Sequence, residues 1–225
     1  HRDLHSFPTR RSSDLTFHFD RAMKNDPENA MAYFHFGNMQ YSYHNDINKA
    51  SEFFLHAFNL LKEREDVVPA ELYYNLSNSL YTLGDQEKAL EFLAELRASS
   101  TFRIRPAIEY LLGLIYYKVG FLEESKEKMN NVLEYYQDEI NDYLRTPNPL
   151  SIRQNKVFYF NAIVQNNLGC VYNALAIRQN KNEYFDISRI HFYKSLELGT
   201  RYSNKNILSL AKVNQIGRAS CRERV

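Results

Sequence analysis

The stretch LGDQEKALEFLAEL, from Leu83 to Leu96, decides the fold of this 225-residue chain. Gly84 is the type of residue that commonly ends a helix, because glycine adopts the left-handed backbone conformation without steric cost. After this glycine, Ala89, Leu93 and Leu96 recur at the spacing of one helix face. The stretch therefore predicts the end of one helix, a tight turn, and a second helix with a small residue four positions before a large one.

The same pattern recurs along the chain. The large residues are Phe19, Phe54, Leu93, Met129 and Phe192, and the small residues four positions before the last four are Ala50, Ala89, Ser125 and Ser188. Large–small pairs recur in the preceding segments, as Phe36-Gly37, Leu76-Ser77, Leu112-Gly113 and Leu168-Gly169. Self-similarity at a period of about 35 residues is typical of stacked supersecondary units, each of which cannot bury its apolar face alone.

The periodicity predicts four helix pairs. Their ranges are 29–44 with 46–63, 69–83 with 85–99, 105–119 with 121–144, and 150–179 with 183–200. A remnant of a second helix precedes them at 16–25, and a further first helix begins near Ser203. Pro147 and Pro149 mark the clearest break in the chain, and we expect one unbroken helix before it, from Leu122 to Tyr143.

These motifs resemble the tetratricopeptide repeat. The L-G-x2-Y pattern occurs at Leu112–Tyr116 and Leu168–Tyr172, the G-D-x-E-K-A pattern at Gly84–Ala89, and the A-x3-F-x2-A pattern at Ala50–Ala57. The resemblance implies an all-α fold, a right-handed superhelical solenoid of antiparallel helix pairs. The chain departs from the family at the fourth position of each repeat, where the family's Trp is replaced by Tyr33, Tyr73, Glu109 and Gln165.

Both ends of the chain are expected to be foreign to the repeat domain. Residues 1–15 and 216–225 match conceptual translations of a short-read sequencing adapter, so we assign residues 16–215 to the repeat domain and exclude the two tails. Without the tails the chain has 22 basic and 24 acidic residues. This near-neutral balance gives no electrostatic reason to expect binding to nucleic acid or to an anionic membrane.

The sequence offers no pattern for catalysis, a cofactor or a metal. Outside the tails the histidines are His18, His35, His44, His56 and His191, and none is spaced as a metal ligand pair. We interpret each as a residue of a helix surface or boundary. Cys170 is the one cysteine outside the tails, and the glycines form no phosphate-binding loop. No apolar run reaches the length of a membrane span. We therefore expect neither an enzyme nor a bound cofactor.

The resemblance implies a concave groove lined by the first helices. The fifth, ninth and twelfth repeat positions place Phe34, Asn38, Tyr41, Tyr74, Asn78, Tyr81, Tyr110, Leu114, Tyr117, Asn166 and Asn173 in it, together with Cys170. Asn38 and Asn78 form a stacked pair in this interpretation, able to bond a peptide main chain. Phe34 stands where peptide-tail clamps of the family have a lysine, which disfavours that subtype. The aromatic residues are equally compatible with packing between helices.

The leading hypothesis is a protein-interaction scaffold or adaptor that binds an extended or helical peptide with apolar side chains. One alternative is a docking arm of a larger enzyme, such as a kinase or glycosyltransferase, whose catalytic part lies outside this chain. Another is a regulatory domain that closes around a peptide signal, as in some bacterial transcription regulators. A cytoplasmic location is expected, and the oligomeric state is left open.

Overall fold

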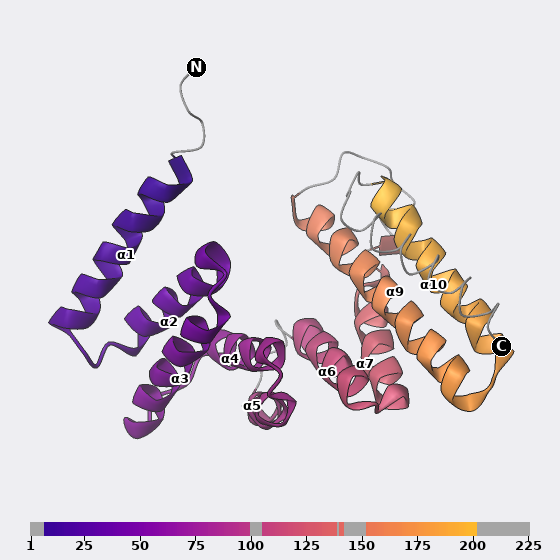
Figure 1. Ribbon diagram of the computed structural model, residues 1–225, viewed down its shortest axis with the longest axis horizontal. Coiled ribbons are helices and arrows are strands. Elements are labelled where there is room, and N and C mark those ends of the chain that lie inside the picture. The colour runs from indigo at the N-terminus through magenta and orange to yellow at the C-terminus, as the bar shows by residue number, and fades with distance from the viewer. Residues whose placement is uncertain (1–6, 100–104, 139, 142–151, 202–225) are drawn as a thin grey trace, which may run out of the picture. The chain divides into compact units, whose positions relative to one another are not determined.

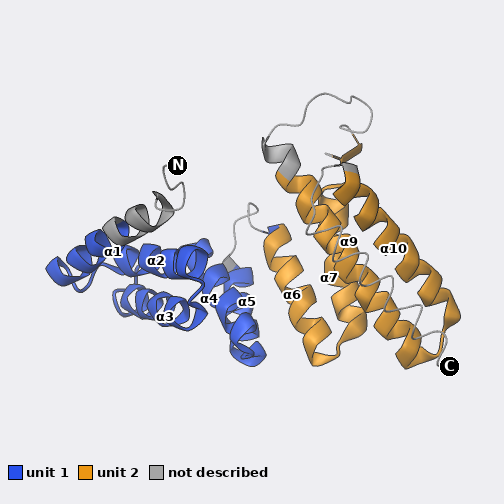
Figure 2. Cartoon of the chain, turned by 45° about the horizontal axis from the view of Figure 1, so that its top comes forward, with its two compact units in different colours: residues 1–105 blue, residues 106–225 orange. Residues whose placement is uncertain are grey.

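The computed structural model describes residues 7–99, 105–138, 140–141 and 152–201, and these residues contain helices and turns but no strand (Figure 1). The chain divides into two compact units, residues 1–105 and residues 106–225 (Figure 2). No helix of the described part is both long enough and apolar enough to cross a membrane. The all-α prediction is confirmed for the described residues.

Unit 1 contains two complete helix pairs and a preceding helix. Its elements are α1 (Phe7–Asn25), α2 (Ala30–Met39), the π-helical turn η1 (Gln40–His44), α3 (Ile47–Glu63), α4 (Ala70–Leu83) and α5 (Gln86–Ser99). Helix α2 packs against α3, and α4 packs against α5. Helix α3 also packs against α4, and α1 packs against α2, so each helix contacts its sequence neighbours as a stacked repeat requires.

Unit 2 contains the other two pairs. Its elements are α6 (Arg105–Val119, which begins at the unit boundary), α7 (Leu122–Tyr135), α9 (Ile152–Gln179) and α10 (Asn182–Arg201). Helix α9 packs along α10 and also against α7 (Figure 1). The core of this unit gathers Met129 and Val132 of α7 with Leu168, Val171 and Leu175 of α9. The structure therefore has a helix in each of the eight predicted segments, with the boundary differences given below.

In three of the pairs a glycine of the first helix admits a large residue of the second helix. A Cβ added to Gly37 of α2 would lie 2.6 Å from the Phe54 ring of α3, and one added to Gly169 of α9 would lie 2.6 Å from the Phe192 ring of α10. Real Cβ atoms do not approach a ring this closely, so these two positions require glycine. The predicted large–small pairing is thus the packing contact of the repeat.

The small residues of the second helices also make polar contacts. Ser125 Oγ donates to the Gly113 carbonyl at 2.7 Å, and Ser188 Oγ donates to the Gly169 carbonyl at 2.7 Å. Both serines are fully buried, so the bonds satisfy hydroxyl groups that would otherwise cost free energy in the core. The two serines therefore join their helices at the same place in two successive repeats.

The turns between paired helices follow from their residues. Gly84 and Gly120 have φ of 93° and 87°, the left-handed conformation that glycine adopts most readily. Asp46 Oδ1 accepts from the Lys49 amide at 3.1 Å and Asp85 Oδ1 from the Lys88 amide at 3.2 Å, so both aspartates cap the second helix. These contacts fix the antiparallel return of the chain.

Two boundary predictions differ from the structure. The helix expected from Leu122 to Tyr143 is interrupted, because α7 ends at Tyr135 and Tyr136 lies in a turn with φ −97° and ψ 2°. The Tyr136 ring makes an edge-on contact with Phe160 of α9, with centroids 6.2 Å apart, so a tertiary contact overrides the helical pattern.

The other difference concerns the start of the chain. Helix α1 begins at Phe7, although the helical remnant was expected from residue 16. The assignment of residues 1–15 as a foreign tail stays a prediction. Several other predicted features lie outside the described residues: the tail 216–225, the break at 144–150, and the first helix expected from Ser203.

Candidate functional site

In unit 1 the first helices α2 and α4 are joined by a row of side-chain hydrogen bonds. Asn75 Nδ2 donates to Asn38 Oδ1 at 2.7 Å, and Asn78 Nδ2 donates to the Tyr41 hydroxyl at 2.8 Å. Each bond connects residues 37 positions apart, which is about one repeat. Because the paired residues lie one turn apart on both helices, the two bonds run side by side across the surface between them.

This arrangement shows the bonding partners of the two asparagines predicted for the groove. Asn38 and Asn78 occupy the same repeat position, but each bonds a different residue, Asn75 or Tyr41, rather than the other asparagine. Each bond therefore joins a residue of one repeat to a residue that stands about one helical turn earlier in the next repeat. The sequence analysis did not predict Asn75 as a site residue. Its position directly before the recurring Leu76-Ser77 pair could have indicated it.

The aromatic residues predicted beside this row differ in exposure. Tyr74 and Tyr81 of α4 are half-buried, and burial raises the pKa of both phenols above the usual value. A raised pKa means that both hydroxyl groups stay protonated and can donate at neutral pH. Phe34 is only 6 % exposed and its ring centroid lies 6.0 Å from that of Phe54, so it packs in the core and offers little surface to a partner.

In unit 2 the corresponding residues are packed more closely. Asn167 Nδ2 of α9 donates to the Tyr110 hydroxyl of α6 at 2.8 Å, and the Tyr110 ring makes an edge-on contact with Phe160. Asn167 lies directly before Leu168, so it is the repeat counterpart of Asn75 and was missed in the same way. Asn166, which was predicted for the groove, is 2 % exposed.

The remaining predicted residues of unit 2 fall into two kinds. Leu114 packs against the core of the unit, whereas Tyr117 is 37 % exposed and Asn173 is half-buried. Tyr117 and Cys170 are close enough to interact electrostatically, and burial raises the pKa of the Cys170 thiol to about 11. Such a thiol is protonated at neutral pH, so it is a poor nucleophile and a poor metal ligand.

A second set of contacts occupies the fourth repeat position, where the family has Trp. Each residue at this position reaches the second helix of its own repeat. The partners are His56 for Tyr33, Glu95 for Tyr73, Asn131 and Lys128 for Glu109, and His191 for Gln165. In three of the four repeats a partner stands two residues after the large core residue, so these three contacts share one register.

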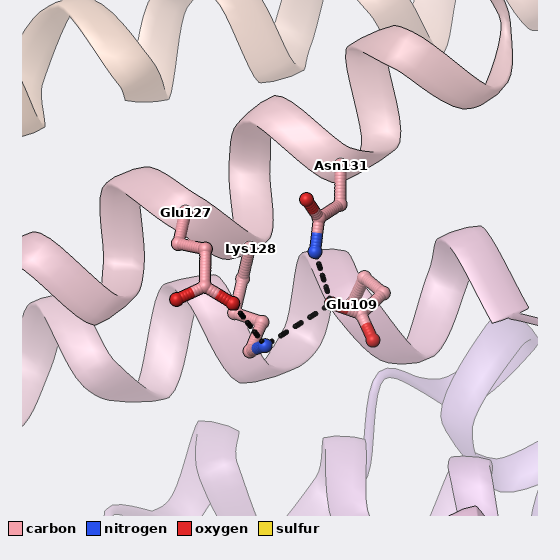
Figure 3. Close-up of polar contacts among 4 residues, drawn as sticks. All are labelled: Glu109, Glu127, Lys128 and Asn131. Carbon is pink, nitrogen blue, oxygen red and sulfur yellow. Dashed lines mark hydrogen bonds and ion pairs between the residues drawn. The ribbon is translucent and has the colours of Figure 1, made fainter.

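The contact of the third repeat contains a buried ion pair. Figure 3 shows the Glu109 carboxylate of α6 facing Lys128 and Asn131 of α7, with Nζ–O and N–O distances of 3.7 and 3.2 Å. Glu109 and Lys128 are 6 % and 9 % exposed. Lys128 also bonds the exposed Glu127 at 2.8 Å, so its charge is shared between two carboxylates. The site is a structural pair between helices rather than an open cleft.

The contact of the fourth repeat contains a partly buried histidine. The Nδ1–H of His191 donates to Gln165 Oε1 at 2.7 Å, and the His191 ring stacks on Tyr172 with centroids 5.2 Å apart. Burial, together with the nearby Lys194 ammonium, lowers the pKa of His191 to about 4. His191 is therefore a partly buried residue at the boundary between α9 and α10, one of the two positions that the sequence predicted for it.

Among the residues that the structure describes, no group of three or more His, Cys, Asp or Glu side chains is arranged to hold a metal ion. The hydrogen-bonded contacts between first helices are built from amides and phenols. Such groups can both donate hydrogen bonds to a partner and accept them from it.

No protein-family model matches this sequence, and no curated protein sequence matches it. Many solved structures share its fold. One is YrrB, described as a TPR protein with an unusual peptide-binding site, which has 18% identity and a TM-score of 0.58 over 93% of this chain and 87% of YrrB. Another is the MamA protein, with 18% identity and a TM-score of 0.58 over 87% of this chain and 88% of MamA.

The pilF protein of Pseudomonas aeruginosa matches with 15% identity and a TM-score of 0.54, over 96% of this chain and 87% of that protein. At these identities the comparisons establish the fold alone. The fold predicted from the repeats, an all-α solenoid of tetratricopeptide-like helix pairs, is therefore confirmed.

Proposed function

We propose that this chain is a protein-interaction repeat domain that binds an extended peptide segment of a partner along the first-helix surface of unit 1. The observation that carries the proposal is the row of hydrogen bonds from Asn38 to Asn75 and from Tyr41 to Asn78. The peptide-binding site of YrrB, a protein of the same fold, is consistent with this use of the scaffold. The row provides polar groups that are held in place before any partner arrives.

The spare hydrogen-bonding capacity of the row matches a peptide main chain. Asn38 uses its carbonyl oxygen to accept from Asn75, which leaves the Asn38 amide hydrogens for a peptide carbonyl. Asn78 uses its amide to donate to Tyr41, which leaves the Asn78 carbonyl oxygen for a peptide N–H. Because each asparagine is restrained by a neighbour, less side-chain entropy is lost when the peptide binds.

The side chains around the row define the peptide further. Helices α2 and α4 contain no Lys or Arg, and Glu71 is the one acidic residue on them. A peptide recognised through acidic side chains or a terminal carboxylate would find no cation on these helices. Tyr74 and Tyr81 instead provide half-buried aromatic area, which suits apolar side chains on either side of the bonded main chain. The proposed ligand segment is therefore extended, apolar and uncharged.

The test is a selection from a random twelve-residue peptide library, followed by calorimetric titration of a selected synthetic peptide. Asn78→Ala is expected to weaken the peptide at least tenfold, because two hydrogen-bonding groups leave the row. Asn59→Ala removes an exposed asparagine of α3 away from the row and is the matched control, which should bind like the parent protein.

Two results would count against the proposal: a library that yields no binding peptide, or selected peptides that bind the Asn78→Ala and parent proteins equally. Thermal unfolding of Asn78→Ala shows whether the fold is retained, since the lost bond to Tyr41 costs only about 1 kcal/mol. The roles of Tyr110, Leu114, Tyr117, Asn166 and Asn173 as partner contacts, and a cytoplasmic location, stay predictions. A docking or regulatory arm of a larger protein is the alternative from the sequence, and it would use the same surface.

A further inference from the structure

Lys62, in the last turn of α3, lies over two aromatic rings and against a carboxylate. Its ammonium nitrogen is 5.4 Å from the centre of the Phe58 ring and 6.0 Å from the centre of the Tyr73 ring. The same nitrogen donates to the Glu95 carboxylate of α5, which also accepts from the Tyr73 hydroxyl at 2.6 Å. Among the residues that the structure describes, no other lysine lies over two rings. Phe58, Tyr73 and Glu95 form a site that we call the ammonium site.

The walls of the ammonium site are held in place by packing. Phe58 and Tyr73 are 8 % and 4 % exposed, and their rings meet edge-on with centroids 5.2 Å apart. Phe92 of α5 also meets the Phe58 ring edge-on, with centroids 5.0 Å apart. The bond from the Tyr73 hydroxyl restrains the Glu95 carboxylate. A cation that enters therefore finds both rings and the carboxylate already in position, and little side-chain entropy is lost when it binds.

The surroundings of the site favour a positive charge. Aromatic faces attract cations, and the carbonyl groups at the C-terminal end of α3 attract them through the helix dipole. The hydrogen bond from Lys62 lowers the pKa of Glu95, so this side chain is a carboxylate at neutral pH. The bond to Glu95 likewise raises the pKa of Lys62, which stays an ammonium. The site therefore selects a cation over a neutral group.

Lys62 can leave this site without disturbing the core. The side chains of Lys62 and Glu95 are 46 % and 43 % exposed, so the ion pair is open to solvent. An exposed ion pair contributes little to the free energy of folding. The four-carbon stem of lysine is flexible, whereas the Phe58 and Tyr73 rings are buried. The site is therefore fixed, and its occupant is exchangeable.

We propose that the ammonium site binds a lysine side chain of a partner protein, and that Lys62 fills the site when the partner is absent. A primary ammonium fits because the Glu95 carboxylate accepts a hydrogen bond, which a quaternary ammonium cannot donate. The proposal goes beyond the peptide-binding row, because it uses the second helices α3 and α5, whereas the row joins the first helices α2 and α4.

The first test asks whether the vacated site takes an ammonium. Lys62→Ala removes three carbons and the nitrogen, and n-propylammonium supplies the same atoms from solution. At about 0.1 M it should raise the unfolding temperature of Lys62→Ala by about 2 °C relative to sodium chloride at the same concentration. The parent protein, whose site is filled, and the double variant Lys62→Ala with Glu95→Gln, which lacks the carboxylate, should not respond. Tetramethylammonium should raise the unfolding temperature of Lys62→Ala less than propylammonium does.

Lys49→Ala is the matched control for this test. Lys49 lies on the same helix and pairs with Asp46 at 3.0 Å, but over no ring among the residues that the structure describes. If removing any paired lysine created an ammonium site, propylammonium would stabilise Lys49→Ala as well. Equal responses of Lys49→Ala and Lys62→Ala to propylammonium, or no response of Lys62→Ala, would overturn the proposal.

The second test asks whether Lys62 competes with a partner. A random peptide library is selected on the parent protein, and a selected peptide that contains lysine is titrated by calorimetry. Lys62→Ala should strengthen its binding at least fivefold, whereas removal of a residue that only supports the fold would weaken it. Glu95→Gln, or norleucine in place of the peptide's lysine, should weaken binding at least tenfold.

Two outcomes of the second test separate this proposal from the proposed function. A selection that yields only uncharged peptides would overturn the ammonium site and leave the peptide-binding row standing. A lysine peptide whose affinity is unchanged or weakened by Lys62→Ala would likewise show that Lys62 does not occupy the partner's position, and the proposal would fail.

Discussion

The partly buried His191 leads to a prediction about acid stability. The imidazole lies between α9 and α10, bonded to Gln165 and stacked on Tyr172, with the Lys194 ammonium near it. Its pKa is lowered from 6.5 to about 4 in the folded protein. Between these two values the unfolded chain takes up a proton that the folded protein resists. Stability is therefore complete above pH 6.5 and is lost as pH falls toward 4.

The size of this loss follows from the pKa difference. Each unit of difference corresponds to about 1.4 kcal/mol, so the cost of His191 amounts to about 2 kcal/mol at pH 5 and about 3 kcal/mol at pH 4. His191→Asn keeps a side chain that can donate to Gln165 but cannot titrate. It is expected to destabilise the protein by about 1 kcal/mol at pH 7.5, through the lost stacking on Tyr172.

The assay is urea unfolding followed by circular dichroism at pH 7.5 and pH 5.0. Between these pH values the parent protein should lose about 2 kcal/mol more than His191→Asn, because other groups titrate equally in both proteins. Hydrogen exchange of peptides from α9 and α10 assigns the loss to this pair, since repeat arrays can unfold in parts. His35→Asn, at an exposed histidine of α2, is the control. Equal pH dependence of parent and His191→Asn would refute the reasoning.

Two further predictions concern packing. Gly169→Ala should lower the free energy of unfolding by about 1–3 kcal/mol, because the new Cβ meets the Phe192 ring. Gly113→Ala should lower it by less, because its new Cβ meets a flexible methionine side chain. The urea unfolding midpoints of the two variants measure the difference. Lys128→Met should lower the free energy of unfolding by about 3–5 kcal/mol, because it leaves the Glu109 carboxylate buried without its cation. The double variant with Glu109→Gln should recover most of that loss in the same measurement. An unchanged unfolding midpoint for Gly169→Ala or for Lys128→Met would contradict the packing contact from which its effect is predicted.

The fold was predictable because its determinants are local and repeat along the chain. The spacing of Phe54, Leu93, Met129 and Phe192, each four residues after a small residue, depends only on helix geometry and on the need for close approach. Gly84 marks a helix end through its own backbone preference. The early end of α7 at Tyr135 was not predicted, because Tyr136 contacts Phe160 of a later helix and the local pattern does not record that contact.

The site was only partly predictable, because a repeat position does not specify which neighbour a polar side chain will reach. Asn38, Tyr41 and Asn78 were placed on the first-helix surface, but the bonding partners of Asn38 and Asn78 depend on the offset between α2 and α4. That offset depends on tertiary packing between successive repeats, such as the contact of Phe58 with Tyr73, and a single sequence does not specify it.

The residues at the fourth repeat position also show that a sequence pattern does not specify the partner of a polar side chain. Tyr33, Tyr73, Glu109 and Gln165 share no chemistry, so the sequence registers them as departures from a Trp pattern. In the structure each finds a compatible partner on its second helix: an imidazole, a carboxylate, an ammonium with an amide, and a second imidazole. Tyr73, Glu109 and Gln165 are buried, and a buried polar group costs free energy unless it is paired, so the partner stabilises each of these three residues. We therefore expect a repeat with an exchanged fourth residue to be stable only when the partner residue is exchanged with it.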